Sequence, residues 1–150
     1  MVPEYLHLPP ESTPPAIPHL PFRAVVVVDE QVTDGWRALV SEWLVAIGCL
    51  YMMAWGDECS LWNDSVDCAN IDAFDNGDIP EDRFVMTTWH DDQPLTEAFW
   101  FAEHCAQHPI VEFDATLILD ITSKARGAEV IALYTASIAH HVLEPGRLVS

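Results

Sequence analysis

The stretch FRAVVVVD, residues 22–29, decides the fold because it is a nearly unbroken run of apolar, mostly β-branched side chains. A strand that is buried on both faces carries such a run, whereas a half-exposed strand alternates apolar and polar residues. Strands of this kind belong to parallel sheets that are covered by helices on both sides. Residues 22–29 therefore predict a central parallel strand of an α/β domain.

A helix and a second apolar run follow this strand directly. Apolar side chains recur at helical spacing between Thr33, a natural N-cap, and Gly48, a natural helix stop. Residues 49–55 then complete a strand–helix–strand unit, whose crossover is expected to be right-handed. Similar patterns predict two more strands and three more helices, at residues 84–89, 116–122, 64–74, 94–108 and 124–142.

These elements predict one α/β domain over residues 22–142, with a mostly parallel four-stranded sheet flanked by helices. The chain of 150 residues, half of them apolar, is long enough for one core and too short for two ordinary domains. Seven prolines make residues 1–21 a Pro-rich extended N-terminal arm. The side chains expected to hold this arm on its own domain are Tyr5, Leu6 and Leu8. Residues 143–150 are expected to form a C-terminal tail.

The charge balance limits the choice of partner. Twenty-four acids against six bases give a net charge of −18, which repels nucleic acid and anionic membranes. The same field attracts a basic protein and accelerates its encounter. No basic start followed by an apolar signal segment is readable, so the cytoplasm is the expected location. No apolar stretch reaches the roughly 20 residues that span a bilayer, so no membrane partner is expected.

Motifs for catalysis are missing from the sequence. The four cysteines form no CxxC pair and are expected to be reduced thiols. His104 and His108 have a spacing at which two imidazoles can share a metal, but a role in stabilising a helix end is favoured. GxSxG, P-loop and GxGxxG motifs do not occur. We therefore predict no catalytic residue, and the protein is more readily explained without an enzymatic activity.

Three segments, RAVVVVDE, WLVAIGCLYMMAWG and FVMTTWHDDQPLTEAFWF, resemble a family of small bacterial domains to which no function is assigned. The resemblance covers roughly residues 22–135. It implies a bacterial source and transfers no catalytic residue, so the function has to be argued from the site itself.

Residues 56–82 contain nine acids and neither Lys nor Arg. Trp62 lies within this acidic segment and is predicted to be an aromatic anchor for a partner. The acids predicted to steer that partner are Asp57, Glu58, Asp64 and Asp67. The leading interpretation is a non-catalytic acidic protein-binding module, an inhibitor or immunity-type partner of a basic protein.

Two alternatives remain open. Acids at the carboxyl ends of the predicted strands resemble the oxygen-rich sites of Mg²⁺-dependent enzymes and phosphoacceptor domains. The candidate metal ligands under this alternative are Asp29, Asp57, Asp91 and Asp92. Otherwise no cofactor is expected. The second alternative is a structural subunit or adaptor that uses the Pro-rich arm. Neither the partner's identity nor the strand order or oligomeric state can be predicted.

Overall fold

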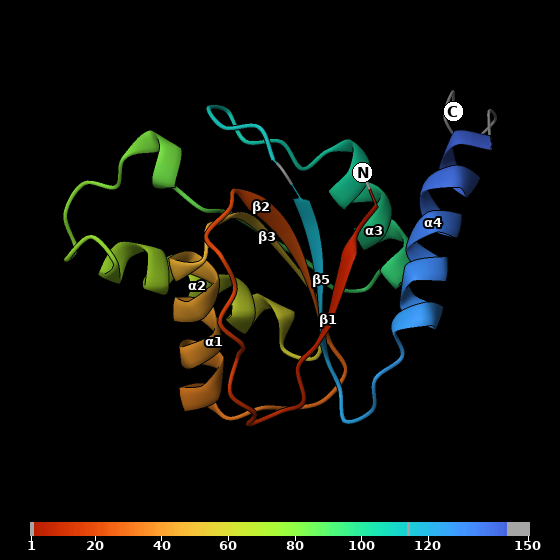
Figure 1. The fold of residues 1–150 in the computed structure, drawn as a ribbon, viewed down its shortest axis with the longest axis horizontal. Coiled ribbons are helices and arrows are strands. Elements are labelled where there is room, and N and C mark those ends of the chain that lie inside the picture. Colours follow the sequence, from red (N-terminus) through yellow and green to blue (C-terminus); the bar gives the residue numbers. More distant parts are fainter. Residues whose placement is uncertain (1, 114, 144–150) are drawn as a thin grey trace.

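Five parallel strands form the central layer of the fold, which a computed structural model describes for residues 2–113 and 115–143 (Figure 1). The strands are β1 (Glu4–His7), β2 (Phe22–Val28), β3 (Cys49–Gly56), β4 (Met86–His90) and β5 (Ala115–Ile121). The helices are α1 (Asp34–Ala46), α2 (Cys59–Asp72), α3 (Leu95–His104) and α4 (Gly127–Leu143), with a 3₁₀ turn at Glu81–Arg83. The protein is thus a single α/β domain, as predicted.

The strand order is β1-β5-β2-β3-β4, and every neighbouring pair is parallel. All seven residues of β2 are buried because β5 and β3 flank it and helices cover both of its faces. Val28 at the end of β2 pairs with Gly56 of β3 and with Ile121 of β5. The carboxyl ends of the strands therefore lie level along one edge of the sheet.

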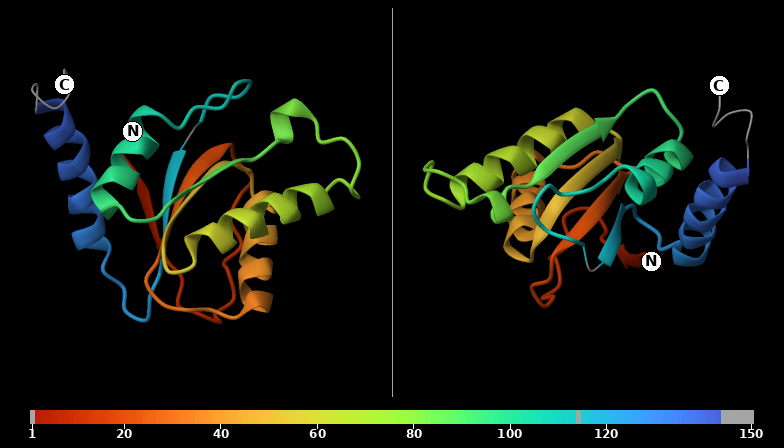
Figure 2. Two further views of the ribbon diagram at one scale, coloured as in Figure 1. Left: turned by 180° about the vertical axis from the view of Figure 1, so that it is seen from behind. Right: turned by 90° about the horizontal axis from the view of Figure 1, so that it is seen from above.

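Two helices cover each face of the sheet, so the fold has three layers (Figures 1 and 2). One core lies under α1 and α2 and includes Val26 of β2 and Met52 of β3. The other lies under α3 and α4 and includes Val25 and Met53. This division follows from the pleat of a strand, which sends successive side chains to opposite faces.

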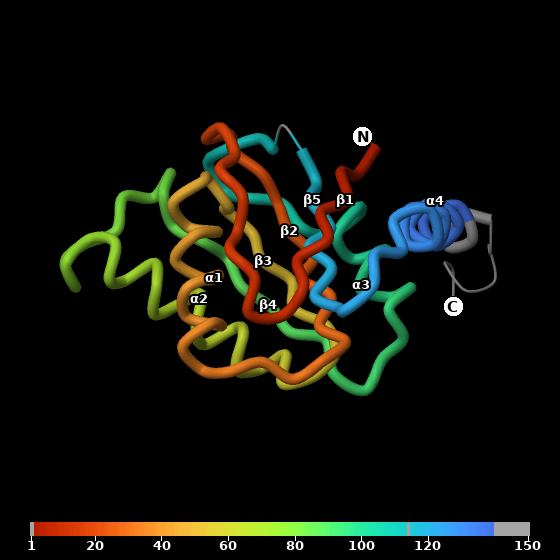
Figure 3. Tube along the Cα trace, turned by 60° about the horizontal axis from the view of Figure 1, so that its bottom comes forward, coloured from red at the N-terminus to blue at the C-terminus, as the bar shows by residue number. Residues whose placement is uncertain are grey.

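The prediction of four strands was wrong, because part of the N-terminal segment belongs to the sheet. The sequence analysis assigned residues 4–7 to an extended Pro-rich arm. In the structure they pair with β5 as an edge strand. The following residues lie against α1, where the indole Nε1 of Trp36 donates to the Ser12 carbonyl and that of Trp43 to the Pro15 carbonyl. Figure 3 follows this segment as it passes α1 before β2 begins. Residues 2–21 therefore lie along the domain, as expected for Leu8, which is buried in the core, but residues 4–7 do so as a strand of the sheet.

The helix boundaries were predicted with mixed success. Thr33 is the N-cap of α1, as expected, because its side chain accepts a hydrogen bond from the Trp36 amide. The helix predicted from Asp64 or Ser65 begins earlier, at Cys59, and runs through the acidic segment. Residues 144–150 of the predicted tail lie outside the described residues.

Candidate functional site at the acidic edge of the sheet

A tight turn places the start of the acidic segment at the carboxyl edge of the sheet. Gly56 has a φ of +102°, and a Cβ on it would lie 2.0 Å from the Val28 carbonyl oxygen, so only glycine fits. Asp57 donates its backbone N–H to the same oxygen at 2.9 Å. Glu58 then adopts a left-handed conformation, with φ 53° and ψ 36°, and α2 begins at the next residue. Asp57 is thereby held at the exposed start of α2.

Trp62 is not the interface anchor that the sequence predicted, because its side chain is 0% exposed. Since α2 begins at Cys59, Trp62 falls on the apolar stripe of the helix together with Val66 and Ala69. Its ring meets Trp36 of α1 edge to face, with 6.3 Å between the ring centroids. Trp62 therefore packs α2 against α1 inside the core, and its acidic neighbours form the surface of this segment.

The predicted steering acids lie on or beside α2. Asp57 and Asp64 are exposed, and Glu58 is exposed while its carboxylate reaches the Arg37 guanidinium at 3.4 Å. Asp67 is half-buried, and its Oδ1 accepts a hydrogen bond of 2.7 Å from the Thr87 hydroxyl of β4. Burial raises the pKa of Asp67, with the Asp64 charge adding to the shift and the Thr87 hydrogen bond opposing it.

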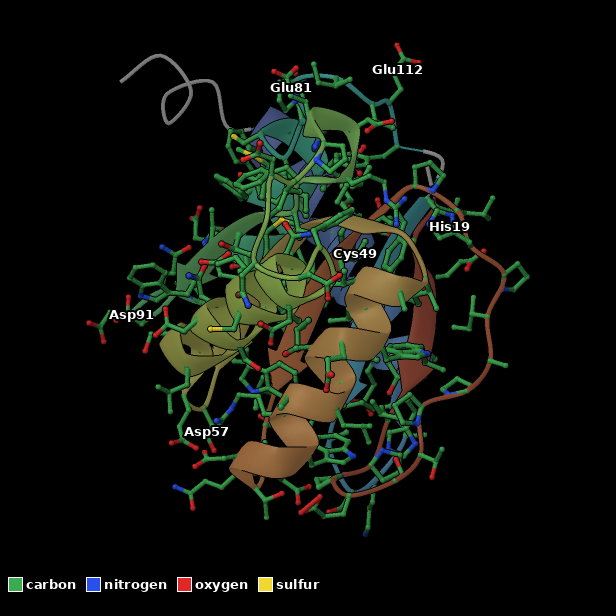
Figure 4. All side chains as sticks on the ribbon, turned by 90° about the vertical axis from the view of Figure 1, so that its left-hand side faces the viewer. His19, Cys49, Asp57, Glu81, Asp91 and Glu112 are labelled. Carbon is green, nitrogen blue, oxygen red and sulfur yellow. The ribbon has the colours of Figure 1, made fainter. Side chains whose placement is uncertain are left out.

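Asp91 and Asp92 extend this acidic surface from the end of β4. Both are exposed, and Asp92 has a positive φ of 55°. They line an open hollow of about 500 Å³ together with Gly56 and His90, at the ends of β3 and β4. In Figure 4, Asp57 and Asp91 lie on the same side of the molecule. We call the group Asp57, Asp64, Asp67, Asp91 and Asp92 the acidic edge.

His90 is the one titratable group of this hollow that is buried. Its Nδ1 lies 3.2 Å from the Gln93 side-chain oxygen, so this nitrogen carries the proton and donates it. Its Nε2 then accepts from the Thr88 hydroxyl at 2.9 Å. Burial lowers the pKa of His90, and the Gln93 hydrogen bond opposes this shift. Both ring nitrogens are therefore engaged within the protein.

Exposed aromatic side chains at this edge escaped the sequence analysis. Trp89 on β4 is 48% exposed, and Phe84, just before the strand, is 46% exposed. A signal was present, because Thr87 and Thr88 interrupt the apolar pattern of this strand, whereas residues 24–28 contain no such break. Polar residues within a strand indicate that it is not buried on both faces, as a central parallel strand is, so an aromatic side chain on it is open to solvent.

The cations of the described residues are largely used inside the molecule. Arg23 pairs with Glu103 at 3.4 Å, and Arg37 pairs with Asp34 and Glu58. Arg126 pairs with Asp29 and Asp120. Of the remaining described cations, Arg83 lies over the Phe74 ring and Lys124 is exposed beyond β5. Three of the six cations of the chain are thus paired with acids that are not members of the acidic edge. Within the described residues, no member of the acidic edge forms an ion pair.

The candidate metal ligands are not brought together. Asp29 binds the Arg126 guanidinium at 3.0 Å, and that guanidinium lies between it and the buried Asp120. Asp57, Asp91 and Asp92 are exposed on the other half of the edge. Over residues 2–113 and 115–139, no three His, Cys, Asp or Glu side chains form a group that could hold a metal ion.

His108 and Cys59 have structural partners. The Nε2 of His108 donates to the Phe84 carbonyl at 2.8 Å, while its Nδ1 accepts from the amides of Ile110 and Val111. Cys59 is buried at the start of α2, and its thiol pKa is raised by burial and then by the Asp91 charge. A raised thiol pKa disfavours the thiolate, which is the form that a nucleophile requires.

The fold and its acidic edge define a small α/β domain with one parallel sheet. A family model with the description "Domain of unknown function (DUF7684)" matches residues 3–137, and the chain belongs to this family. Comparisons with curated proteins and with solved structures gave no match. Within the described part of the chain, no helix has the length and apolar character needed to cross a membrane.

Proposed function

We propose that this domain is a non-catalytic module that binds a basic protein through the acidic edge. The observation that carries the proposal is the placement of the cations, because Arg23, Arg37 and Arg126 are paired with acids outside this group, although Glu58, one partner of Arg37, directly follows Asp57. The edge is therefore left with negative charge that no described cation balances. Charged surfaces of this kind steer an oppositely charged partner and select against wrong ones.

The exposed aromatic residues add a hydrophobic contribution to this surface. Trp89 and Phe84 lie at the two ends of β4, next to Asp67 and Asp91. Interfaces commonly combine a buried aromatic anchor with a polar rim, and the rim contributes mainly to specificity and association rate. Trp89 replaces Trp62 as the anchor in this proposal.

An inhibitor or immunity-type partner of a basic enzyme, such as a nuclease, is the form of binding module that fits this surface. Nucleic acid itself is a poor ligand, because its phosphates require Lys or Arg side chains that this surface lacks. The proposal includes the bacterial source and the cytoplasmic location that the sequence analysis expects.

Two matched triple variants test the proposal. Asp57→Asn, Asp64→Asn and Asp91→Asn remove three charges from the acidic edge. Glu42→Gln, Glu112→Gln and Glu129→Gln remove three charges from exposed positions on α1, on the loop before β5 and on α4. Each variant and the wild-type protein is immobilised and used to capture proteins from an extract of the source organism at about 50 mM and about 300 mM NaCl.

The wild-type protein and the Gln variant are expected to retain the same basic protein at low salt, identified by mass spectrometry, and to release it at high salt. The Asn variant is expected to lose it. Equal capture by all three proteins, or capture of acidic proteins alone, would overturn the proposal. Circular dichroism of the variants shows whether each one is folded.

A further inference from the structure

The outer edge of β4 is open in a way that natural sheets usually prevent. β4 is the last strand in the sheet order, and no strand of the described chain pairs with its outer side. Edge strands expose a row of backbone N–H and C=O groups, and proteins normally protect them with proline, lysine, a bulge or a covering segment. The strand Met86–His90 contains neither proline nor lysine and pairs with β3 in continuous register.

The opposite edge strand, β1, also has no strand on its outer side within the described chain, but it is shorter and follows a proline. β1 has four residues and directly follows Pro3. The Tyr5 hydroxyl donates to Asp120 and accepts from the Arg126 amide just before α4, while the His7 ring contacts the Thr122 carbonyl. Side chains therefore tie the β1 edge to the turn before α4, whereas the outer edge of β4 carries exposed Trp89.

Side chains along β4 are arranged as a receiving surface for an extended segment. Thr87 points to the α2 side, where it binds Asp67, and Trp89 shares that face because side chains alternate along a strand. An open hollow of about 400 Å³ continues along the start of the strand. Its lining includes Ile71, Phe84, Met86 and Thr87. Backbone pairing along β4 would therefore bring a bound segment into contact with both apolar and acidic side chains.

The surrounding charges determine which occupant suits this edge. Asp67 lies beside the middle of β4, and Asp91 and Asp92 follow its end. A second copy of the chain would bring these acids against their own counterparts, with a net charge of −18 on each molecule, and like charges in direct opposition are destabilising. A segment that alternates Lys or Arg with apolar residues would instead be attracted.

We propose that a basic partner adds an extended segment to the outer edge of β4 as a sixth strand of the sheet. This inference rests on the proposed function and specifies how the acidic edge takes its partner. Main-chain hydrogen bonds give affinity in this mode of recognition, and alternate side chains give specificity.

The first test uses a synthetic peptide of eight residues that alternates Lys and Val, and a second peptide of the same sequence with every backbone N–H methylated. The two carry the same charge, but the second cannot donate to a neighbouring strand. The unmodified peptide is expected to bind the full chain at least about tenfold more tightly in titration calorimetry, because several backbone hydrogen bonds are lost with methylation. Equal affinities would overturn strand addition while leaving the electrostatic proposal in place.

Hydrogen exchange then locates the bound peptide on the wild-type protein. The unmodified peptide is expected to slow the exchange of amides within residues 86–90, and unchanged exchange there would overturn the inference. Trp89→Lys is expected to weaken the peptide at least about tenfold. Its matched control is Leu39→Lys on α1, which has the same charge change and similar exposure, 49% against 48%, and is expected to leave the affinity unchanged.

Two further outcomes separate this inference from the proposed function. If neither peptide binds but the acidic edge captures a basic protein, strand addition is wrong and the proposed function stands. If neither a peptide nor a basic protein binds, both are wrong. Sedimentation of the free protein completes the test. A dimer that protects the amides of residues 86–90 from exchange would identify a second copy of the chain as the occupant. That result would overturn the inference that a basic segment binds there.

Discussion

The two edges of this sheet treat negative charge in opposite ways. At the β1 edge, Asp120 is fully buried and accepts hydrogen bonds from the Tyr5 hydroxyl and from Nε and one terminal nitrogen of Arg126. At the β4 edge, Asp91 and Asp92 are exposed, and no hydrogen bond or ion pair of their side chains is recorded within the described residues. One edge is closed by internal pairing, and the other is open.

This difference shows that the acids of the chain play different parts, because some are paired with cations and others are not. A buried carboxylate is tolerated only with a cation and hydrogen-bond donors, so it requires an arginine of its own. Arg126 serves Asp120 in this way, while the buried Arg23 and Arg37 pair with less buried acids, and the acidic edge is left without these three of the six cations. The closed edge therefore contributes to stability, while the open edge is the surface that we propose for a partner.

The largest expected effect is on stability, and it differs between Trp62, on the buried face of α2, and Trp89, on the open edge. Trp62→Ala would leave a cavity between α1 and α2 and is expected to lower the free energy of unfolding by about 4 kcal/mol. Trp89→Ala removes a half-exposed side chain and is expected to cost less than about 1 kcal/mol. Urea unfolding monitored by circular dichroism measures both. Equal losses would show that Trp89 is packed as tightly as Trp62 and would contradict the exposed position of Trp89 on the open edge.

The second prediction concerns the pairing that closes the β1 edge. Asp120→Ala leaves Arg126 and the Tyr5 hydroxyl without their shared acceptor, and we expect a loss of about 3 kcal/mol in the free energy of unfolding. Asp91→Ala at the open edge is the matched control, with an expected change within about 0.5 kcal/mol. Hydrogen exchange of residues 4–7 should accelerate in the first variant. A small loss with unchanged exchange would contradict the closing role of this pair.

Four of the five strands, including the edge strand β4, could be predicted from the sequence, but the edge strand β1 could not. Residues 22–28 predict a buried strand because nearly all of their side chains, on both faces of the strand, are apolar. Residues 4–7 carry no such pattern, and this strand depends on partners more than 100 residues away, namely the backbone of β5 and the side chain of Asp120. Interactions at that distance leave no trace in a local pattern.

The candidate site was predicted in part for a similar reason. The exposed acids Asp57 and Asp64 could be found, since a run of acids without cations has no place in a core. Trp62 was misassigned because α2 starts after Glu58, a non-glycine residue with a positive φ that sequence rules do not anticipate. The placement of that one residue moves the tryptophan from a loop to the inner face of a helix.

The smallest expected effect tests whether the open edge responds to pH. His90 at the end of β4 has a pKa that burial lowers below its unfolded value, so the folded protein binds fewer protons than the unfolded chain. Stability from this group is therefore complete above the unfolded pKa of about 6.5 and is lost as the pH falls through it. Arg126 at the closed edge stays charged over this range, with its pKa raised mainly by the hydrogen bonds to Asp120.

Unfolding in urea at about pH 7.5 and about pH 5.5 measures this difference. His90→Asn is expected to be less stable than the wild-type protein at the higher pH and to lose less stability on acidification. Gln93→Ala removes the hydrogen bond that raises the pKa of His90, so it is expected to lower that pKa further and to increase the loss. Parallel pH curves for the wild-type protein and His90→Asn would show that the imidazole does not control the pH response. The open edge would then differ from the closed one in its unpaired acids and exposed backbone alone.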